Sequence, residues 1–361
     1  MSNASTFWSP RIAALEPYVP GEQPRIANLI KLNTNENPYP PSPRVVSAIK
    51  RAVESGLERY PDPESAVLRE ALAEQHGLDA SQVFVGNGSD EVLAHAFFAF
   101  FQQSEPLLIP DVTYSFYRVY AQLYGIACEL EAVDEGLRVD AEALAARAAS
   151  GCGGIVVSNP NAPTGIGLPL AQIELLLLAC PNRVVLVDEA YVDFGGESAL
   201  PLIGRYPNLL VVQTLSKSRS LAGLRVGFAF GQAHLVDGLQ RVKNSFNSYP
   251  VDRLALAGAL AAIEDEDWFE RTRKDVIDTR EGLLLQLEDL GFEVLPSQAN
   301  FLFARHPAHD ACRLAASLRE KAVLVRHFQQ PRIAEYLRIS VGTRDQCSAL
   351  VDALADILGA Q

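Results

Sequence analysis

The feature that most constrains the fold is an alternation of short apolar runs with helical stretches between about residue 81 and residue 230. Each run is rich in Val, Leu and Ile and has the length of a buried strand. The runs occupy residues 83–85, 107–109, 154–157, 184–187 and 209–212. Strands that alternate with helices form a mostly parallel sheet with helices on both faces. The sequence therefore predicts an α/β fold whose ligands bind at the carboxyl ends of the strands.

The chain length of 361 residues exceeds what one ordinary hydrophobic core supports, so we expect more than one domain. After Pro250 the pattern changes to a helix over 252–264, a long bridging helix over 268–290, and further strands and helices. We expect an N-terminal arm over 1–40 that packs with the small domain, a large domain over 41–251, and a small α+β domain over 252–361.

The composition indicates which classes of binding partner are unfavourable for this chain. A formal net charge of −13 argues against nucleic acid and anionic membranes as main partners. The five cysteines are scattered without a Cys-x-x-Cys pair, which predicts reduced thiols in the cytoplasm and no metal or disulfide framework. The N-terminus lacks the features of a signal peptide, and no apolar run approaches the roughly 20 residues of a membrane span.

Residues 210–228, LVVQTLSKSRSLAGLRVGF, carry the most specific chemistry. Lys217 lies just past a predicted strand, Thr214 and Ser216 precede it, and Arg225 follows eight positions later. A lysine amine forms a Schiff base with an aldehyde, while hydroxyls and a guanidinium hold a phosphate. Pyridoxal 5′-phosphate (PLP) carries both groups. The alternative is a solvated Lys and Arg on a loop.

A carboxylate at the end of the neighbouring run strengthens this interpretation. Asp188 ends the run 184–187 and could pair with the protonated pyridine nitrogen of PLP, which keeps the ring an electron sink. Tyr191 could place its hydroxyl on the 3-oxygen of the ring. The alternative is an Asp that caps a helix, followed by a Tyr that packs in the core.

Three further strand ends carry candidate ligands. Gly88, Ser89 and Asp90 enter a helix and present free N–H groups to an anion, although Ser89 and Asp90 are also good N-caps. Tyr114 could stack on a planar cofactor, with plain core packing as the alternative. Asn159 could donate to the 3-oxygen, in a loop that its prolines hold rigid, with a cis bond as an option.

A charged residue also interrupts a predicted strand of the small domain. Arg338 lies in the apolar stretch 336–342, where a charge is costly unless it meets an anion. A guanidinium there would clamp a carboxylate or phosphate bidentately. The alternative is an arginine that points to solvent. The Asn-rich run 32–40 is either a surface turn or a rigid loop that lines a site.

Eight blocks of the sequence share their order and approximate spacing with a known family. They are LNTNENPYP, ERYPDP, VGNGSDE, SNPNAPTG, VDEAYVDF, TLSKSRSLAGLRVGF, SQANFLF and LRISVGT. Together they resemble the aspartate aminotransferase superfamily of PLP enzymes, fold type I, and within it the histidinol-phosphate aminotransferase subfamily. Residues 328–335, FQQPRIAE, depart from the glycine-rich loop of many members, which puts substrate contacts there in doubt.

The resemblance implies a role for each candidate residue. Lys217 forms the Schiff base, Asp188 pairs with the pyridine nitrogen, Asn159 and Tyr191 contact the 3-oxygen, Tyr114 stacks on the ring, and Gly88, Ser89, Asp90, Thr214, Ser216 and Arg225 lie around the phosphate. Arg338 holds the substrate anion with help from Arg326, and Tyr18 and Asn35 lie near the substrate. Tyr60 reaches the phosphate of the neighbouring subunit, which implies a homodimer.

The activity implied by the resemblance is ping-pong amino transfer between L-histidinol phosphate and 2-oxoglutarate, which yields imidazolylacetol phosphate and L-glutamate in histidine biosynthesis. Two PLP enzymes would use the same residues, an aromatic-amino-acid transaminase and an amino-acid-phosphate decarboxylase. A ligand-sensing domain of a transcription regulator is the non-enzyme alternative. Such regulators carry a helix-turn-helix, and the proline-rich arm is too short to form one.

Overall fold

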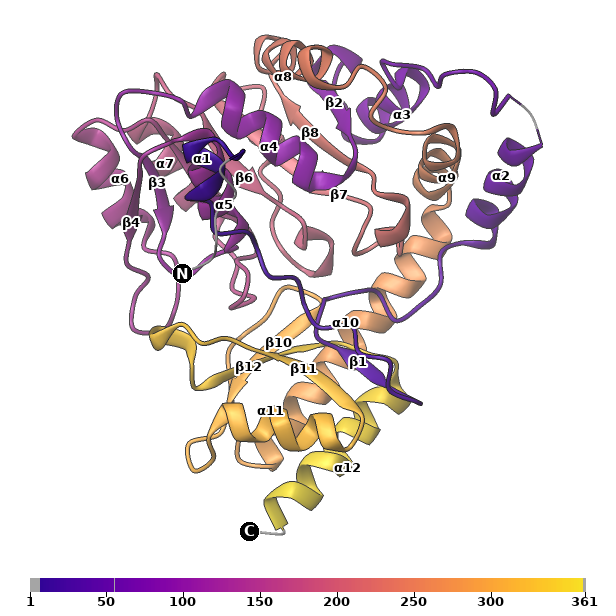
Figure 1. The fold of residues 1–361 in the computed structure, drawn as a ribbon, viewed down its shortest axis with the longest axis vertical. Coiled ribbons are helices and arrows are strands. Elements are labelled where there is room, and N and C mark those ends of the chain that lie inside the picture. Colours follow the sequence, from indigo (N-terminus) through magenta and orange to yellow (C-terminus); the bar gives the residue numbers. More distant parts are fainter. Residues whose placement is uncertain (1–6, 55, 360–361) are drawn as a thin grey trace.

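The computed structural model describes residues 7–54 and 56–359 and contains two β-sheets (Figure 1). The larger sheet has the strand order β2-β8-β7-β6-β5-β3-β4. Its strands are β2 (Val83–Gly86), β3 (Leu107–Pro110), β4 (Cys128–Glu131), β5 (Gly154–Ser158), β6 (Val185–Asp188), β7 (Leu209–Thr214) and β8 (Gly227–Gly231). Only β8 runs antiparallel to its neighbours. The predicted α/β fold with a mostly parallel sheet is therefore confirmed.

Helices cover both faces of this sheet because its strands are apolar on both sides. Ile155 and Val157 of β5 pack into one core, and Val156 between them packs into the other. The first core lies under α3 (Ala66–His76), α6 (Ala141–Ala149), α7 (Leu170–Ala179) and α9 (Arg253–Glu264). The second lies under α4 (Gly88–Phe100), α5 (Phe116–Tyr124) and α8 (Ala233–Phe246). The alternation of side chains along a strand explains the two cores.

The smaller sheet has the order β1-β11-β12-β10-β9 and a core of its own. Its strands are β1 (Ile30–Leu32), β9 (Glu293–Val294), β10 (Phe301–Arg305), β11 (Val323–His327) and β12 (Tyr336–Ser340). The helices α10 (Glu266–Asp289), α11 (Ala311–Glu320) and α12 (Arg344–Gly359) pack against it. In Figure 1 this sheet and its helices lie below the larger sheet, and α10 runs between the two parts.

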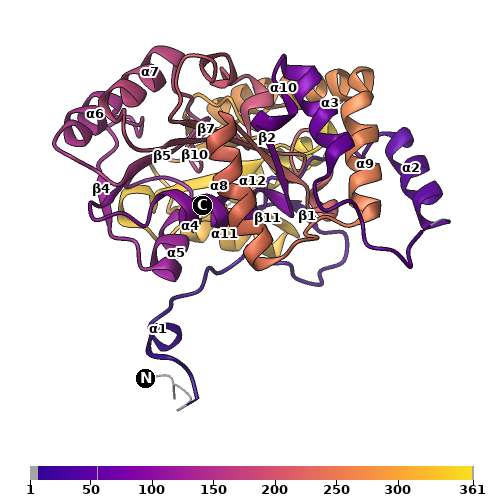
Figure 2. The same ribbon diagram turned by 90° about the horizontal axis from the view of Figure 1, so that it is seen from above.

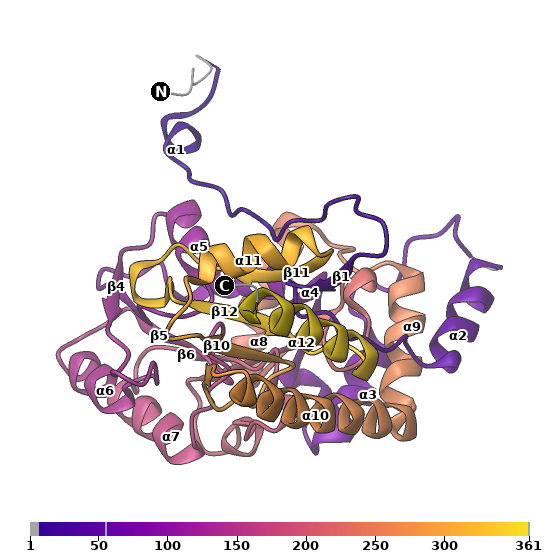
Figure 3. The same cartoon turned by 90° about the horizontal axis from the view of Figure 1, so that it is seen from below.

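The N-terminal arm joins both parts of the molecule. Its strand β1 pairs in parallel with β11, which attaches the arm to the smaller sheet. Farther upstream, Gln122 of α5 bonds to the backbone of Ala14 and Glu16, which attaches the arm to the larger sheet. Figures 2 and 3 show the preceding helix α1 (Pro10–Ala13) extending away from the body of the molecule.

Several elements were not anticipated from the sequence. These are β1, β4, α6 and α8, which have weak or short apolar patterns. The helix α2 (Pro43–Val53) precedes the larger sheet, and Pro43 occupies its first position. The cis option in the loop after β5 is confirmed, since Asn159–Pro160 and Ala162–Pro163 are both cis. None of the helices in the described ranges is long and apolar enough to cross a membrane.

Candidate active site

A cavity of about 240 Å³ lies between the two sheets, beside the carboxyl ends of β5, β6 and β7. The N-terminal arm and the strands β11 and β12 contribute its other walls. The predicted residues that line it are Tyr18, Asn35, Ser89, Asp90, Tyr114, Asp188, Tyr191, Thr214, Ser216, Lys217, Arg225, Arg326 and Arg338. The fold therefore brings together candidates that come from strand ends, from the arm and from the smaller sheet.

The amine of Lys217 reaches into this cavity. Its Nζ donates a hydrogen bond to the backbone carbonyl of Thr34 at 3.3 Å and lies 5.7 Å from the centre of the Tyr191 ring. The adjacent Ser218 is hydrogen-bonded to Asp193, which fixes the turn after β7. Lys217 is therefore a half-buried amine with a main-chain acceptor, and the alternative of a solvated loop lysine does not apply.

Asp188 is a buried carboxylate at the end of β6. Its Oδ2 accepts a hydrogen bond from the Tyr117 hydroxyl at 2.8 Å, and its Oδ1 accepts one from the Ala190 backbone N–H at 3.1 Å. Burial raises the pKa of Asp188 to about 6, although both hydrogen bonds act in the opposite direction. No α-helix begins at this residue, so the helix-cap alternative does not apply. A carboxylate so placed favours a cationic partner.

Two tyrosines also line the cavity. The Tyr114 hydroxyl donates to Asp90 at 3.2 Å, and its ring packs edge-on against Tyr117. Burial raises the pKa of Tyr114 well above its usual value, so its hydroxyl stays protonated. The Tyr191 hydroxyl accepts a hydrogen bond from the Asn35 side chain at 3.1 Å, and its ring packs edge-on against Phe301. Both rings are thus fixed by a hydrogen bond and a ring contact.

The start of α4 and the residues around Arg225 form a cradle for an anion. The first N–H groups of α4 have no carbonyl within the helix to bond, and the helix dipole favours negative charge there. Arg225 donates to Asp90 at 3.1 Å from a left-handed backbone with φ of 54°. Gly88 has a left-handed backbone with φ of 80°, which favours glycine, and a Cβ there would lie 2.5 Å from the Arg225 guanidinium and displace it. Ser216 and Thr214, hydrogen-bonded to each other at 2.9 Å, complete the cradle.

Two arginines face each other at the opposite end of the cavity. Arg326 of β11 and Arg338 of β12 occupy paired positions of the antiparallel ladder. Among the described residues, neither forms an ion pair with a carboxylate, and the Arg338 Nε has no hydrogen-bond partner. Burial lowers the pKa of Arg338, and the charge of Arg326 acts in the same direction. Arg338 lines the cavity, so the alternative of a solvent-facing arginine does not apply.

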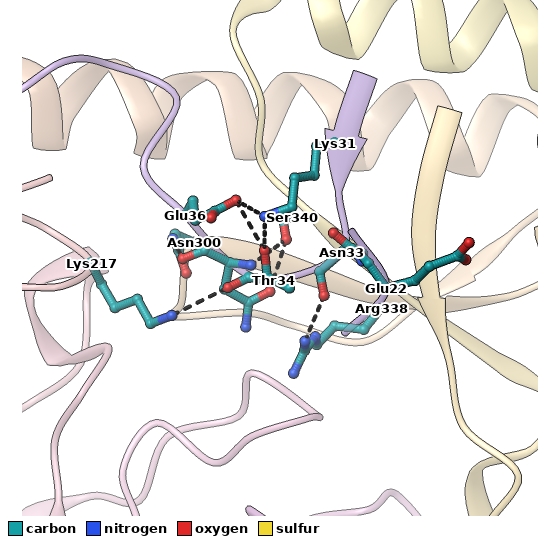
Figure 4. A network of polar contacts seen from close by, with 10 residues as sticks. Glu22, Lys31, Asn33, Thr34, Glu36, Lys217, Asn300, Arg338 and Ser340 are labelled. Atoms are coloured by element: carbon teal, nitrogen blue, oxygen red, sulfur yellow. Dashed lines mark hydrogen bonds and ion pairs between the residues drawn. The ribbon is translucent and has the colours of Figure 1, made fainter. Parts of the chain in front are cut away.

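Residues 33–36 connect the two ends of the cavity, as Figure 4 shows. The Asn33 carbonyl accepts a hydrogen bond from Arg338 at 3.0 Å, and the next carbonyl, of Thr34, accepts the one from Lys217. Asn35 has a left-handed backbone with φ of 55°, and its N–H donates to Ser340 at 2.8 Å. The Asn-rich run 32–40 therefore lines the site rather than forming a surface turn, and its carbonyls set the spacing between lysine and arginine.

Three predicted residues lie outside the cavity lining. The Asn159 side chain is fully buried, donates to the Glu197 carbonyl at 3.1 Å and accepts from the Leu168 N–H at 2.7 Å. It stabilises the loop after β5 and is not among the residues that line the cavity, so its contact with a 3-oxygen stays a prediction. Gly88 contributes backbone to the cradle. Tyr60 is 78% exposed and stacks on Tyr249, away from the cavity of its own chain.

Sequence reasoning missed several residues that complete the site. Tyr117 was given no role at the site from the sequence, yet its hydroxyl is the donor to Asp188. Asn300 donates to the Asn35 carbonyl at 2.9 Å, and Ser340 donates to the Asn35 side chain at 2.9 Å. Both lie in blocks that carry the resemblance, SQANFLF and LRISVGT, but neither had a chemical signal of its own. Only their placement beside the arm shows their role.

The atypical loop 328–335 connects the two parts of the molecule. Its Phe328 ring lies about 5.5 Å from the guanidinium of both cavity arginines. Its Arg332 forms an ion pair with Asp111 at 2.8 Å, across to the larger sheet. The loop therefore covers the arginine end with an aromatic ring and anchors it to the opposite wall.

The chain matches a known protein family over nearly its whole length. Residues 27–354 match the family model "Aminotransferase class I and II". The histidinol-phosphate aminotransferase of Gluconacetobacter diazotrophicus is 60% identical over 354 residues, which cover 98% of each chain. Histidinol-phosphate aminotransferase 1 of Pseudomonas aeruginosa is 61% identical over 350 residues, which cover 97% of this chain and 99% of the relative.

Solved structures share the same fold. The histidinol-phosphate aminotransferase of Sinorhizobium meliloti, solved in complex with pyridoxal 5′-phosphate, superposes with a TM-score of 0.88 at 24% identity and covers 99% of both chains. The aspartate aminotransferase of Thermus thermophilus with maleate superposes with a TM-score of 0.83 at 21% identity, over 97% of this chain and 99% of the other. At such identities the likeness concerns the fold.

Proposed function

The chain belongs to the aminotransferase class I and II family, and from that premise we propose that it is a PLP-dependent transaminase that acts on L-histidinol phosphate. The amino group passes to 2-oxoglutarate, and the products are imidazolylacetol phosphate and L-glutamate. This places the reaction in histidine biosynthesis. A cytoplasmic location is part of the proposal and rests on the scattered cysteines of the sequence.

One observation carries this function. The cavity has two cationic regions at opposite ends, the cradle with Arg225 and the pair Arg326 and Arg338, and Lys217 and Asp188 also line it. A phosphorylated cofactor would use the first region and an anionic substrate the second. The arginine pair lacks a carboxylate partner among the described residues, which favours an anion with several oxygens.

The residues present fit PLP group by group. The N–H groups at the start of α4, with Ser216 and Arg225, suit a phosphate dianion. The buried Asp188 carboxylate suits a protonated ring nitrogen, and the half-buried Lys217 amine suits an aldehyde. Tyr191 supplies the hydroxyl within the cavity, whereas Asn159 is engaged in its own loop.

When bound, PLP supplies an electron sink that allows a proton to leave the substrate carbon that bears the amine. Lys217 would first hold the aldehyde through its amine. Once its amine is free, Lys217 accepts the proton from that carbon and returns it on the other side of the transferred nitrogen. The Thr34 carbonyl, an acceptor for Lys217 Nζ, orients the amine while it carries the proton.

The remaining residues orient and stabilise. Asp188 keeps a positive charge on the ring nitrogen, and Tyr117 and Ala190 hold the carboxylate in place. Arg338 and Arg326 bind the phosphate of L-histidinol phosphate in one half-reaction and a carboxylate of 2-oxoglutarate in the other. The same pair serves both substrates because each presents an anion.

A kinetic comparison of amino donors tests the substrate. We expect kcat/KM for L-histidinol phosphate to exceed that for L-phenylalanine by roughly 100-fold or more, since a missing anion leaves two half-buried guanidiniums unpaired. Arg326→Ala should reduce kcat/KM more with L-histidinol phosphate than with L-glutamate, because a phosphate has more oxygens for two guanidiniums. A preference for L-phenylalanine, or equal losses with both donors, would instead favour an aromatic or broad-range transaminase.

We further propose that the enzyme is a homodimer in which Tyr60 reaches the cradle of the partner subunit. Two features support this: Tyr60 lies outside the cavity of its own chain, and it stacks on Tyr249, which is itself 42% exposed, so two exposed aromatic rings lie side by side on the surface. Mixing inactive Tyr60→Ala and Lys217→Ala chains tests it, because mixed dimers would regain one complete site. Absence of any regained activity in verified mixed dimers would contradict the proposal.

A further inference from the structure

Two buried cysteines outside the cavity bring their sulfur atoms into contact. Cys152 precedes β5, Cys180 follows the end of α7, and their Sγ atoms lie 3.2 Å apart. The two residues are 5% and 4% exposed, and neither lines the candidate active site. We propose that this pair is a reversible redox site, in which a hydroperoxide converts the two thiols into a disulfide.

The backbone on both sides holds the two sulfurs in this position. The Cys180 N–H donates to the Leu176 carbonyl at 3.2 Å, and its carbonyl accepts a hydrogen bond from the buried Asn208 side chain at 2.9 Å. Next to Cys152, the Gly153 N–H donates to the Pro106 carbonyl at 2.8 Å. The approach of the sulfurs is therefore set by the packing of α7 against the sheet.

The surroundings make one of the two thiols the better nucleophile. The hydrogen bond with Cys180 lowers the pKa of the Cys152 thiol against the opposing effect of burial, and the Gly154 N–H and the guanidiniums of Arg147 and Arg183 lower it further. The same hydrogen bond and burial raise the pKa of Cys180. A thiolate next to positive charge, with a second thiol in contact, is the arrangement found in redox-active cysteine pairs.

A small oxidant has only a short distance to travel to this site. Ser150 and Gly151 form an exposed turn directly before Cys152, and Pro181 and Asn182 are exposed directly after Cys180. Both sulfurs thus lie just below the surface. The exposed Cys312 thiol, by contrast, has no cysteine as a hydrogen-bond partner among residues 7–54 and 56–359, so it provides an internal comparison.

The chemistry balances with hydrogen peroxide as the oxidant. The Cys152 thiolate attacks one peroxide oxygen, so an S–O bond forms, the O–O bond breaks, and one water leaves after protonation. The Cys180 sulfur then attacks the Cys152 sulfur, so the S–S bond forms and the S–O bond breaks, and the second water leaves with the Cys180 proton. Each sulfur gives up one electron and the peroxide gains two. The sulfurs need to close from 3.2 Å to about 2.05 Å.

The disulfide would connect residues 28 positions apart, across a segment that contains β5 and α7. Such a cross-link restricts the unfolded chain, so we expect the thermal midpoint of the oxidised holoenzyme to rise by several degrees. Amino-transfer activity should stay within about twofold, because neither cysteine lines the cavity. A higher thermal midpoint with unchanged amino-transfer activity would show that oxidation of the cysteine pair does not alter the active site.

The test uses the intact holoenzyme and a modest molar excess of hydrogen peroxide. Free thiols counted after denaturation should fall from five to three, and peptide mapping should find Cys152 linked to Cys180. Dithiothreitol should restore all five. Cys312→Ala should lose two thiols in the same way, whereas Cys152→Ala and Cys180→Ala should form no such link. Five remaining thiols, a link to another cysteine, or Cys152 oxidised beyond recovery by dithiothreitol would each overturn the proposal, and all three can be read on the unaltered protein.

Discussion

The two ends of the cavity differ in how far the protein satisfies its own charges. At the lysine end, each charge has a partner within the chain. Asp188 accepts a hydrogen bond from Tyr117, Arg225 pairs with Asp90, and Lys217 has a backbone acceptor. These groups keep their positions without a ligand, as a site that retains one cofactor through many turnovers requires.

At the arginine end the charges oppose one another. Arg326 and Arg338 occupy paired positions of the ladder, and within the described part of the chain their guanidiniums have one polar partner, the Asn33 carbonyl, which accepts from Arg338. The negative faces of the Phe328 and Phe301 rings attract these guanidiniums, but an aromatic ring does not neutralise their charge. This end favours an anion, as suits the substrate that we propose binds and leaves here.

The largest expected effect is at the lysine end. Lys217→Ala removes both the group that holds the aldehyde and the group that carries the proton, so we expect turnover to fall by roughly 10⁴-fold or more. PLP should still bind through the cradle and Asp188. Borohydride reduction followed by peptide mapping should locate the cofactor on Lys217 in the wild type, and the exposed Lys274→Ala is the matched control. A label on another lysine would refute the assignment.

A smaller but still large effect is expected for Asp188→Asn. The change preserves shape and removes the charge that keeps the ring nitrogen protonated, so we expect a loss of roughly 10²- to 10³-fold in turnover with the fold intact. Circular dichroism and bound-PLP absorbance report on the fold and the cofactor. A variant within about tenfold of wild type, or about 1.4 kcal/mol of barrier, would mean that Asp188 only shapes the turn after β6.

The arginine end should respond differently. Arg338→Lys keeps the charge but loses the planar fork, so we expect kcat/KM to fall roughly 10- to 100-fold with both L-histidinol phosphate and L-glutamate. PLP content should remain unchanged, because Arg338 lies away from the cradle. Single-turnover titrations with each donor measure both half-reactions. Loss of PLP in this variant would erase the distinction between the two ends.

The predictability of the two ends from sequence also differs. Lys217 and Asp188 were found because apolar runs mark the strands, and polar residues just past parallel strands gather at one edge of a sheet. Arg338 was found because a charge inside an apolar strand needs an anion. These inferences need only local sequence and one rule of topology.

The remaining parts of the site depend on contacts that local sequence does not encode. Asn159 was expected in the cavity, but its side chain bonds to Glu197 and Leu168, which are 38 and 9 positions away, and such partners cannot be read from the local sequence. The pairing of β1 with β11 spans nearly 300 positions, and the Asn35 contacts of Ser340 and Asn300 follow from it. Only the packed structure decides such long-range partners.

The free energy of unfolding shows how much the hydrogen bond from Tyr117 to Asp188 stabilises the lysine end. Tyr117→Phe leaves a buried Asp188 oxygen without its donor, so we expect unfolding to cost about 1–3 kcal/mol less at pH 8. Burial raises the pKa of Asp188 from 3.8 to about 6 in the folded protein. The resulting contribution of Asp188 to the free energy of unfolding is therefore fully present below pH 3.8 and is lost as the pH rises through 6. The variant raises this pKa further. Denaturant titrations should therefore show a deficit that widens between pH 5 and pH 8, and a constant deficit would indicate lost packing alone.

The smallest effect should have the opposite sign, and it would come from the arginine end. Arg326→Met keeps an unbranched side chain against Phe328 and removes one of two like charges at paired positions, so unfolding in the absence of substrate should cost about 0.2–1 kcal/mol more. Inorganic phosphate should stabilise the wild type more than the variant, because the second guanidinium is gone. A gain in stability together with weaker substrate binding would mean that the repulsion between Arg326 and Arg338 costs stability but improves binding of the anion. A loss of stability would mean instead that the protein itself satisfies Arg326, and the two ends would then be built alike.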